Sequence, residues 1–245
     1  MGITNLRCIC YTKRMSLARY RNIVVLTGAG ISHSAGLPTY RGAGGLWSDP
    51  ALVELSNARA MIERRGEACD LFWRFRGALA KVEPTPAHRA LAAFEDRLPP
   101  GARFLIITQN VDGLHQRAGS RGVCEYHGSL ASWRCDACRS TRVPGDGEPP
   151  PVCCDQRMRP DVVLFGELIP ALAERAAKHA LRDCDLFVAI GTSGTVSPAS
   201  SFVRWAQLNG ARCVLLNLEI FDGARELYGE LEAGPADELV PRWFA

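Results

Sequence analysis

Residues 22–30 read NIVVLTGAG, and this stretch decides the fold. Its first six residues are a short, apolar, β-branched run, and they lead directly into Gly28-Ala29-Gly30. A buried strand that runs into glycines and then into a helix is typical of the first βα unit of a nucleotide-binding domain. A simple structural turn is the alternative, because the glycines do not have the G-x-G-x-x-G spacing of the dinucleotide fingerprint.

Three further apolar runs resemble the first in length and continuity: residues 104–108 (FLIIT), 186–190 (LFVAI) and 213–217 (CVLLN). Helical patterns lie between them, over residues 86–96, 171–181 and 199–209. Strands that are covered on both faces read as continuous apolar runs. Alternating strands and helices therefore predict an α/β fold with a doubly wound, Rossmann-like parallel sheet, which binds ligands at the carboxyl ends of its strands.

Two stretches interrupt this alternation. Residues 48–83 have helical spacing and no strand pattern, and residues 129–160 hold four cysteines and the breaker run PGDGEPPP. We expect residues 16–48, 84–128 and 160–245 to form the Rossmann-like domain. The helical insert (49–83) and a zinc-binding insert (129–159) would form a small domain. Residues 1–15 are expected to be a flexible extension, with Met15 as an alternative first residue.

The composition excludes several classes of protein. The chain has 245 residues, is 47% hydrophobic and carries a formal net charge of +3. This is the composition of a globular protein, and no stretch approaches the roughly 18 apolar residues of a membrane span. The basic residues are scattered and the start has no signal-peptide pattern. We therefore expect a cytoplasmic monomer with reduced thiols, no nucleic-acid partner and no membrane contact.

Polar residues follow each predicted strand. Gln109, Asn110 and Asp112 follow residues 104–108, Gly191-Thr192-Ser193 follow 186–190, and Asn217-Leu218-Glu219 follow 213–217. Amides, hydroxyls and carboxylates at this edge can bind ribose hydroxyls and a carboxamide. Helix capping by Asn110 or Asp112 is the alternative, and it explains one residue of three. His127 lies in a short loop beside Gly128, where an exposed histidine can act as a base.

Taken together, seven motifs resemble the sirtuins, the NAD-dependent protein deacylases. In chain order they are GAGIS (28–32), PTYRG (38–42), TQNVDGLH (108–115), HGSL (127–130), RPDVVLFGE (159–167), GTSGTVSP (191–198) and LNLE (216–219). The resemblance implies a Rossmann-like domain, a small zinc-plus-helical module and NAD in the cleft between them. It also implies the reaction: the acyl-lysine oxygen attacks the nicotinamide ribose, and the products are nicotinamide, O-acyl-ADP-ribose and free lysine.

The resemblance further implies roles for individual residues. His127 would be the general base, and Asn110 would belong to the catalytic site. The acyl-lysine peptide would pair, as an added edge strand, with Val163, Phe165, Gly166 and Glu167. The NAD-binding residues would be Gly28, Ala29, Gly30, Ser32, Thr39, Tyr40, Arg41, Trp47, Gln109, Asn110, Val111, Asp112, Gly191, Thr192, Ser193, Asn217, Leu218, Glu219 and Ala236.

The chain departs from the sirtuin pattern at its cysteines. Sirtuin zinc is held by two C-x2-C pairs, and only Cys135-x2-Cys138 fits. The second pair is the adjacent Cys153-Cys154, which is awkward on one tetrahedral ion unless the backbone is irregular. We expect these four cysteines to bind one structural zinc. The alternative is a degenerate knuckle in which Cys153 or Cys154 is free.

A second departure concerns the acyl group. A sirtuin branch that removes acidic acyl groups carries Tyr-x-x-Arg on its helical insert, and this chain has Trp73-x-x-Arg76. Residues three apart share a helix face, and arginine can bind a terminal carboxylate bidentately. We therefore expect desuccinylase and demalonylase activity together with deacetylase activity. The alternatives are helix packing for Trp73 and a solvated charge for Arg76.

Two other functions remain open at this point. ADP-ribosyl transfer or NAD hydrolysis would use the same cleavage of the nicotinamide bond, but would not require His127. A non-catalytic NAD-sensing or interaction module would not require Gln109, Asn110, Asp112 and His127 together.

Overall fold

A six-stranded parallel sheet organises the larger part of the chain. The structure is a computed structural model that describes residues 17–37, 50–145 and 147–245. The strand order is β11–β10–β9–β1–β2–β3, and every neighbouring pair is parallel. The strands are β1 (Asn22–Thr27), β2 (Arg103–Thr108), β3 (Val123–Glu125), β9 (Leu186–Ile190), β10 (Arg212–Asn217) and β11 (Glu230–Ala233). The predicted Rossmann-like sheet and its four predicted strands are confirmed.

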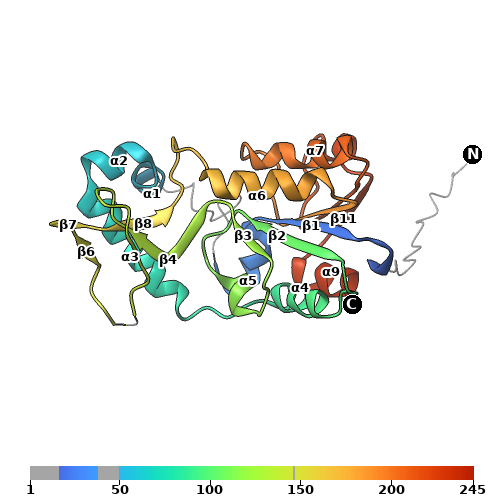
Figure 1. Cartoon of the computed structure of the whole chain (residues 1–245), viewed down its shortest axis with the longest axis horizontal. Coiled ribbons are helices and arrows are strands. Elements are labelled where there is room, and N and C mark those ends of the chain that lie inside the picture. The colour runs from blue at the N-terminus through green and yellow to red at the C-terminus, as the bar shows by residue number, and fades with distance from the viewer. Residues whose placement is uncertain (1–16, 38–49, 146) are drawn as a thin grey trace, which may run out of the picture.

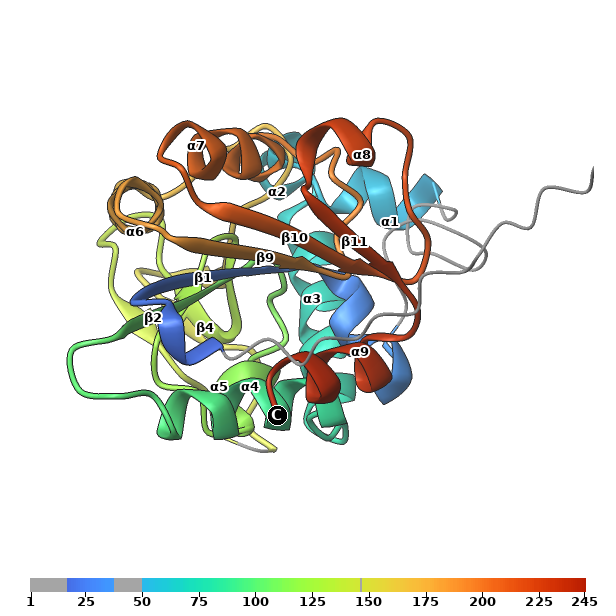
Figure 2. The ribbon, with the colours of Figure 1, turned by 90° about the vertical axis from the view of Figure 1, so that its right-hand side faces the viewer.

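Helices cover both faces of this sheet, as Figures 1 and 2 show. One face carries α6 (Ala171–Arg182), α7 (Phe202–Leu208) and α8 (Ala224–Leu227), and the other carries α4 (Pro86–Asp96) and α9 (Ala236–Trp243). Side chains of β1 alternate between the two cores, because successive residues of a strand point to opposite faces. Val24 and Leu26 pack towards α6 and α7, whereas Ile23 and Val25 pack towards α4 and α9.

Local sequence explains where α4 begins. Pro86 occupies its first turn, where the missing N–H costs nothing. Thr85 and His88 form a reciprocal capping box, in which each side chain accepts from the other residue's backbone N–H. This part of the chain also contains the 3₁₀ helices η1 (Leu17–Arg19), η2 (Ala29–Ala35) and η4 (Ala199–Ser201), and the short α-helix α5 (Leu114–Arg117).

The two inserts pack on each other beside the sheet (Figure 1). The helical insert contains α1 (Pro50–Leu55), α2 (Ala58–Glu63) and α3 (Arg65–Leu79). The second insert contains a three-stranded sheet of β4 (Gly128–Arg134), β5 (Thr141–Arg142) and β8 (Arg159–Val162), and a hairpin of β6 (Val152–Cys153) and β7 (Gln156–Arg157). They share a hydrophobic core around the fully buried Trp133. This separate core supports our proposal that the inserts form a small domain.

In the described part of the chain, no helix is both long and apolar enough to cross a bilayer.

Candidate functional site

Two glycine loops meet at the carboxyl ends of β1 and β9. A Cβ atom at Gly28 would lie 2.7 Å from the Gly191 carbonyl oxygen, and one at Gly30 would lie 2.6 Å from the Gly191 Cα. Gly191 itself has φ +60, a conformation that favours glycine. The Gly30 N–H donates to the Gly191 carbonyl at 3.0 Å. The glycines therefore bring two strand ends into backbone contact, which a Cβ atom at these positions would prevent.

Asn110 lies at the centre of the same edge and is 5% exposed. Its Nδ2 donates to the Gly28 carbonyl and to Ser32 Oγ, each at 3.2 Å. Ser32 Oγ in turn donates to Asp112 Oδ2 at 2.8 Å. The Asn110 Oδ1 atom is buried and has no hydrogen-bond partner among the residues that the structure describes. A buried unpaired acceptor is costly, so this oxygen marks a place where a ligand donor would be stabilised.

Asp112 performs the capping role that we considered as an alternative, and it also contacts the site. Its Oδ1 accepts from the Leu114 N–H at 3.0 Å, in the first turn of α5, while its Oδ2 accepts from Ser32. One carboxylate therefore orders the start of a helix and holds a hydroxyl beside Asn110.

The next strand ends supply further polar groups. Thr192 is 4% exposed, and its Oγ1 is buried with no hydrogen-bond partner in the described ranges of the chain. Thr192 also lines a small hollow with Gln109. Asn217 Nδ2 donates to the carbonyls of Thr192 and Glu219, at 3.2 and 2.8 Å, so it ties the loops after β9 and β10 together. The Asn110 and Thr192 oxygens, with the glycine-lined edge between them, fit the polar groups of NAD.

His127 lies between β3 and β4, at the other end of this edge, and is half-buried. Its Nδ1 lies 3.0 Å from the Gln109 carbonyl oxygen. Since a carbonyl only accepts, Nδ1 carries the proton and Nε2 is left as the basic nitrogen. Burial lowers the pKa of His127 below its ordinary 6.5, and the bond to Gln109 partly opposes this. The imidazole is therefore neutral near pH 7, the form that a general base requires.

Two buried histidines belong to this region and were missed by sequence reasoning. His88 and His115 pack edge to face with ring centroids 4.6 Å apart. His115 Nε2 lies 2.9 Å from Thr27 Oγ1, and His88 Nδ1 lies 2.8 Å from Thr85 Oγ1. Burial lowers the pKa of His88 to about 4 and the pKa of His115 well below 6.5. His115 belongs to a quoted motif, but nothing in the sequence pointed to its pairing with His88.

The other predicted NAD-binding residues stay predictions. Thr39, Tyr40, Arg41 and Trp47 fall outside the described residues. Leu218 is 59% exposed, and Ala236 is the first residue of α9. The roles of Ala29, Val111, Ser193, Leu218, Glu219 and Ala236 stay predictions.

The segment after β8, residues 163–167, is the predicted edge for the acyl-lysine peptide. β8 ends at Val162, and Gly166 has φ +88 and turns the chain. Phe165 makes a bridge to Asn57 and is 53% exposed. The pairing of this segment with a substrate peptide stays a prediction.

Trp73 and Arg76 lie together on α3, as their spacing predicts. The Arg76 guanidinium carbon lies 5.1 Å from the centroid of the Trp73 ring, and Trp73 packs edge to face against Trp133, also at 5.1 Å. Arg76 Nη2 donates to the Pro144 carbonyl, in the second insert. Arg76 Nε is buried and finds no hydrogen-bond acceptor within residues 17–37, 50–145 and 147–245. Trp73 thus packs within the small domain, and Arg76 is half-buried against Trp73 and Pro144. The role of both residues in an acyl pocket stays a prediction.

The four cysteines meet at one point. The Sγ atoms of Cys135, Cys138, Cys153 and Cys154 all lie within 4.8 Å of one another. Cys154 and Asp155 have φ +49 and +58, and they form the two-residue turn between β6 and β7. Two positive φ values are typical of the tight hairpin turn that follows the twist of its strands. This irregular backbone lets adjacent cysteines face one centre, and four thiols fit a tetrahedral zinc ion.

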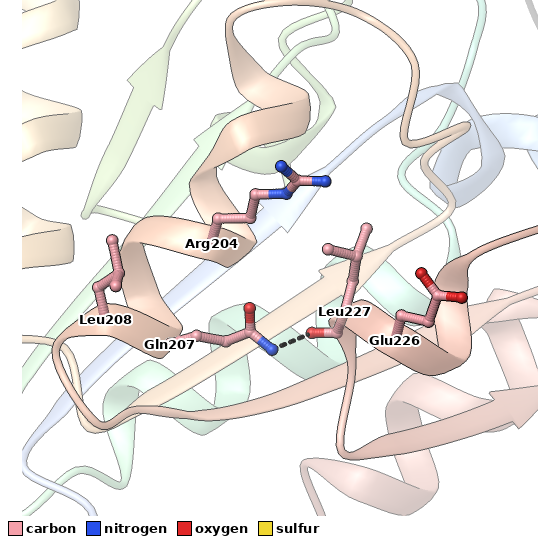
Figure 3. A pocket seen from close by; sticks show the side chains of 5 residues that line it. All are labelled: Arg204, Gln207, Leu208, Glu226 and Leu227. Carbon is pink, nitrogen blue, oxygen red and sulfur yellow. Dashed lines mark hydrogen bonds between the residues drawn. The ribbon is translucent and has the colours of Figure 1, made fainter.

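A separate surface hollow lies between α7 and α8, with a volume of about 490 Å³. Figure 3 shows its lining side chains, among which Gln207 Nε2 donates to the Leu227 carbonyl at 2.8 Å. The hollow is lined by Arg204, Gln207, Leu208, Glu226 and Leu227. None of the described residues that we predicted for the site is among them.

Comparison with known proteins identifies relatives along most of the chain. The family model described as "Sir2 family" matches residues 28–198. A protein of Thermus thermophilus named "NAD-dependent protein deacylase" is 42% identical over 84% of this chain and 83% of its own length. "NAD-dependent protein deacylase 1" of Pseudomonas aeruginosa is 40% identical over 92% of this chain and 94% of its own.

Solved structures agree with this. One described as a Sir2 homolog–NAD complex superposes with a TM-score of 0.81 at 33% identity, covering 93% of this chain and 89% of that one. A mutant Sir2 homologue in complex with ADP-ribose gives a TM-score of 0.83 at 32% identity, covering 93% of this chain and 92% of that one.

Proposed function

The chain belongs to the Sir2 family and is an NAD-dependent protein deacylase, and we propose that it removes succinyl and malonyl groups from lysine as well as acetyl groups. The assembly at the strand ends supports the deacylase reaction, because it combines an unpaired amide oxygen with a neutral histidine. Arg76 supports the acyl preference, because it holds a buried donor without a partner beside an aromatic ring.

The polar residues at the sheet edge would bind NAD. Asn110 Oδ1 would accept from the carboxamide of the nicotinamide end, and Thr192 Oγ1 would contact a more distant part of the dinucleotide. NAD supplies a ribose carbon that becomes electrophilic when nicotinamide leaves. The buried setting of Asn110 would keep water away from that carbon, which favours transfer over hydrolysis.

His127 would accept a proton from a ribose hydroxyl at Nε2. Its Nδ1–H bond to the Gln109 carbonyl fixes both the ring orientation and the tautomer that this requires. A positioned general base typically contributes about 10²- to 10⁴-fold to a rate. ADP-ribosyl transfer to another acceptor would not need this contribution, so the placement of His127 favours the deacylase.

The cysteine cluster would hold one zinc ion with a structural role. The insert has few apolar residues of its own, and a closed four-thiolate site would join β6–β7 to the loop after β4. The four cysteines would bind the ion, and the reaction would take place elsewhere, at the sheet edge.

Arg76 would bind the carboxylate of an acidic acyl group. A guanidinium has five N–H donors, so the bond to the Pro144 carbonyl leaves donors for a ligand. The Trp73 face covers one side of the guanidinium and reduces its exposure to water, which strengthens a charge-assisted bond. Trp73 packs against the same hydrophobic core as Val111, the neighbour of Asn110.

One experiment tests the proposal. The purified protein is incubated with NAD and with acetyl-, succinyl- and malonyl-lysine peptides that share one sequence, and both peptide mass and free nicotinamide are followed. We expect NAD-dependent loss of all three acyl groups, with one nicotinamide released per acyl group. Nicotinamide release without a change of peptide mass would indicate NAD hydrolysis, and a gain of ADP-ribose would indicate transferase activity. Removal of the acetyl group alone would refute the acidic-acyl proposal.

We place this reaction in the cytoplasm. Supporting this, the eight cysteines in the described ranges are free thiols, as expected in a reducing compartment.

A further inference from the structure

The segment 163–167 contacts two parts of the protein. The Val163 N–H donates to the carbonyl of His127 at 2.8 Å. The Phe165 N–H donates to Ser56 at 3.2 Å, and the Phe165 carbonyl accepts from Ala58 at 2.9 Å. This short, irregular segment therefore connects the loop that carries His127 to the helical insert.

A largely buried ion pair joins this segment to the start of β8. Arg159, at the start of β8, has a side chain that is only 4% exposed, and that of Glu167 is 22% exposed. Arg159 Nη1 and Nη2 donate to the two carboxylate oxygens of Glu167, at 2.5 and 3.0 Å. This is the bidentate, charge-assisted geometry that gives the strongest hydrogen bonds between side chains.

The same two side chains also bind the backbone around them. Arg159 Nη2 donates to the Val162 carbonyl at 2.9 Å, at the end of β8. Glu167 Oε2 accepts from the Leu164 N–H at 2.9 Å, and the Glu167 N–H donates to the Leu164 carbonyl at 3.0 Å. The turn from Leu164 to Glu167 is thus closed by a backbone bond and by a side-chain bond.

These contacts leave Glu167 little capacity to bind a substrate. Both of its oxygens accept from Arg159, and Oε2 also accepts from Leu164. The Arg134 guanidinium lies 3.9 Å from Oε1 as a second positive charge. The pKa of Glu167 is lowered by the bonds from Arg159 and Leu164, although its burial opposes this, so the carboxylate stays charged.

We propose that Arg159 and Glu167 are positioning residues for the acyl-lysine peptide: their ion pair fixes the backbone of residues 163–166 relative to His127, and Glu167 is not itself a ligand of the substrate. This inference rests on the proposed function, because it takes residues 163–166 as the peptide-binding edge. Loss of either charge would loosen the turn and weaken peptide binding. NAD would bind as before, since its residues lie at the strand ends.

The test uses Glu167→Gln and Arg159→Lys in the full-length protein, with steady-state kinetics on acetyl-lysine peptides. Glutamine keeps the size of Glu167 and one acceptor for the Leu164 N–H, so this variant is expected to fold. We expect each variant to raise the peptide KM about tenfold, the scale of one lost charged hydrogen bond, and to change the NAD KM less than about twofold.

Glu232→Gln is the matched control. Glu232 is a carboxylate of similar exposure (29%) that is bound by Arg242 and Trp243, on β11 at the opposite edge of the sheet from β3. We expect it to lower the melting temperature without raising the peptide KM. The kinetics are measured with two acetyl-lysine peptides, one with neutral flanking residues and one with lysine-rich flanking residues. Glu167→Gln and Arg159→Lys should each raise the KM of both peptides.

Three outcomes would overturn the inference. An unchanged peptide KM in Glu167→Gln would show that the ion pair does not position the edge. A rise confined to the lysine-rich peptide, and absent from Arg159→Lys, would make Glu167 a direct ligand. Equal increases in the peptide and NAD KM values would indicate a general structural defect. Absence of acyl removal by the wild-type protein would instead refute the proposed function.

Discussion

His127 and Gln109 are joined by a hydrogen bond of 3.0 Å between the imidazole Nδ1–H and the backbone carbonyl. Gln109 directly follows β2, and His127 lies between β3 and β4, so two neighbouring strands of the sheet determine where the imidazole points. Because Nδ1 is used in this way, the reactive nitrogen is Nε2. The ring cannot exchange the roles of its nitrogens without losing this bond.

Replacing His127 with alanine should lower deacylation by about 10²-fold or more, because a general base is lost. NAD binding should remain, since Asn110 and Thr192 are unchanged. The loss of activity is checked by the turnover of an acetyl-lysine peptide, and the retained NAD binding is checked by calorimetry. His179→Ala, an exposed histidine on α6, is the control and should have wild-type turnover. Near wild-type turnover in His127→Ala would exclude it as the base.

The pH dependence of the reaction follows from the same residue. Burial lowers the pKa of His127 below 6.5, and the neutral form is the active one. In a plot of kcat/KM against pH, the midpoint of the acidic limb should therefore lie below pH 6.5. Above this limb, kcat/KM should stay constant up to pH 7.5. A midpoint above 6.5 would mean that the histidine is stabilised as a cation, against the observed environment.

The buried pair of His88 and His115 should make folding stability depend on pH. Their folded-state pKa values are lower than 6.5, so the unfolded state binds more protons as the pH falls below 6.5. The free energy of unfolding should fall with decreasing pH, with a slope for each histidine that steepens below pH 6.5 towards a limit of about 1.4 kcal/mol per pH unit. Urea unfolding between pH 7 and 5 measures this. His88→Gln should show a shallower slope than the wild type, and an unchanged slope would contradict the assignment.

Freshly purified protein should contain about one zinc ion per chain, because four thiolates complete a structural site. Cys154→Ser should lose this zinc and lower the melting temperature. Cys213→Ser changes a buried cysteine of β10, away from the cluster, and should keep the zinc. Metal analysis of the three proteins decides between a four-cysteine site and a degenerate knuckle. Full zinc occupancy in Cys154→Ser would show that Cys154 is not a ligand.

The sequence predicts those parts of the fold that carry a continuous apolar signal. Residues 22–27 and 186–190 are strands as expected, because their side chains are buried on both faces. The edge strands β3 and β11 were missed, because the first has three residues and the second reads ELEA, with two glutamates. Neither has the apolar run that marks a central strand.

The sequence predicts candidate residues for the site but not the contacts between them. Motifs indicated Asn110 and His127 as candidates. The burial of Asn110 Oδ1 without a partner in the described residues, and the hydrogen bond between His127 and Gln109, depend on the folded structure and could not be predicted from the motifs. The adjacent Cys153 and Cys154 looked awkward because sequence does not show that their turn adopts positive φ. Glu167 was expected to contact the substrate peptide. Its ion pair with Arg159 could not be predicted, because the sequence does not show the turn that brings the two side chains together.

The most direct test of the account compares kcat/KM for succinyl- and acetyl-lysine peptides in the wild type, Arg76→Met and Arg74→Met. Arg74 is exposed on the same helix and serves as the control. A bidentate contact to a carboxylate typically contributes about 1.5–3 kcal/mol, so Arg76→Met should reduce desuccinylation about tenfold to hundredfold relative to deacetylation. Arg74→Met should change neither. Equal losses on the two peptides in Arg76→Met would contradict the account and make Arg76 a structural residue held by Trp73 and Pro144.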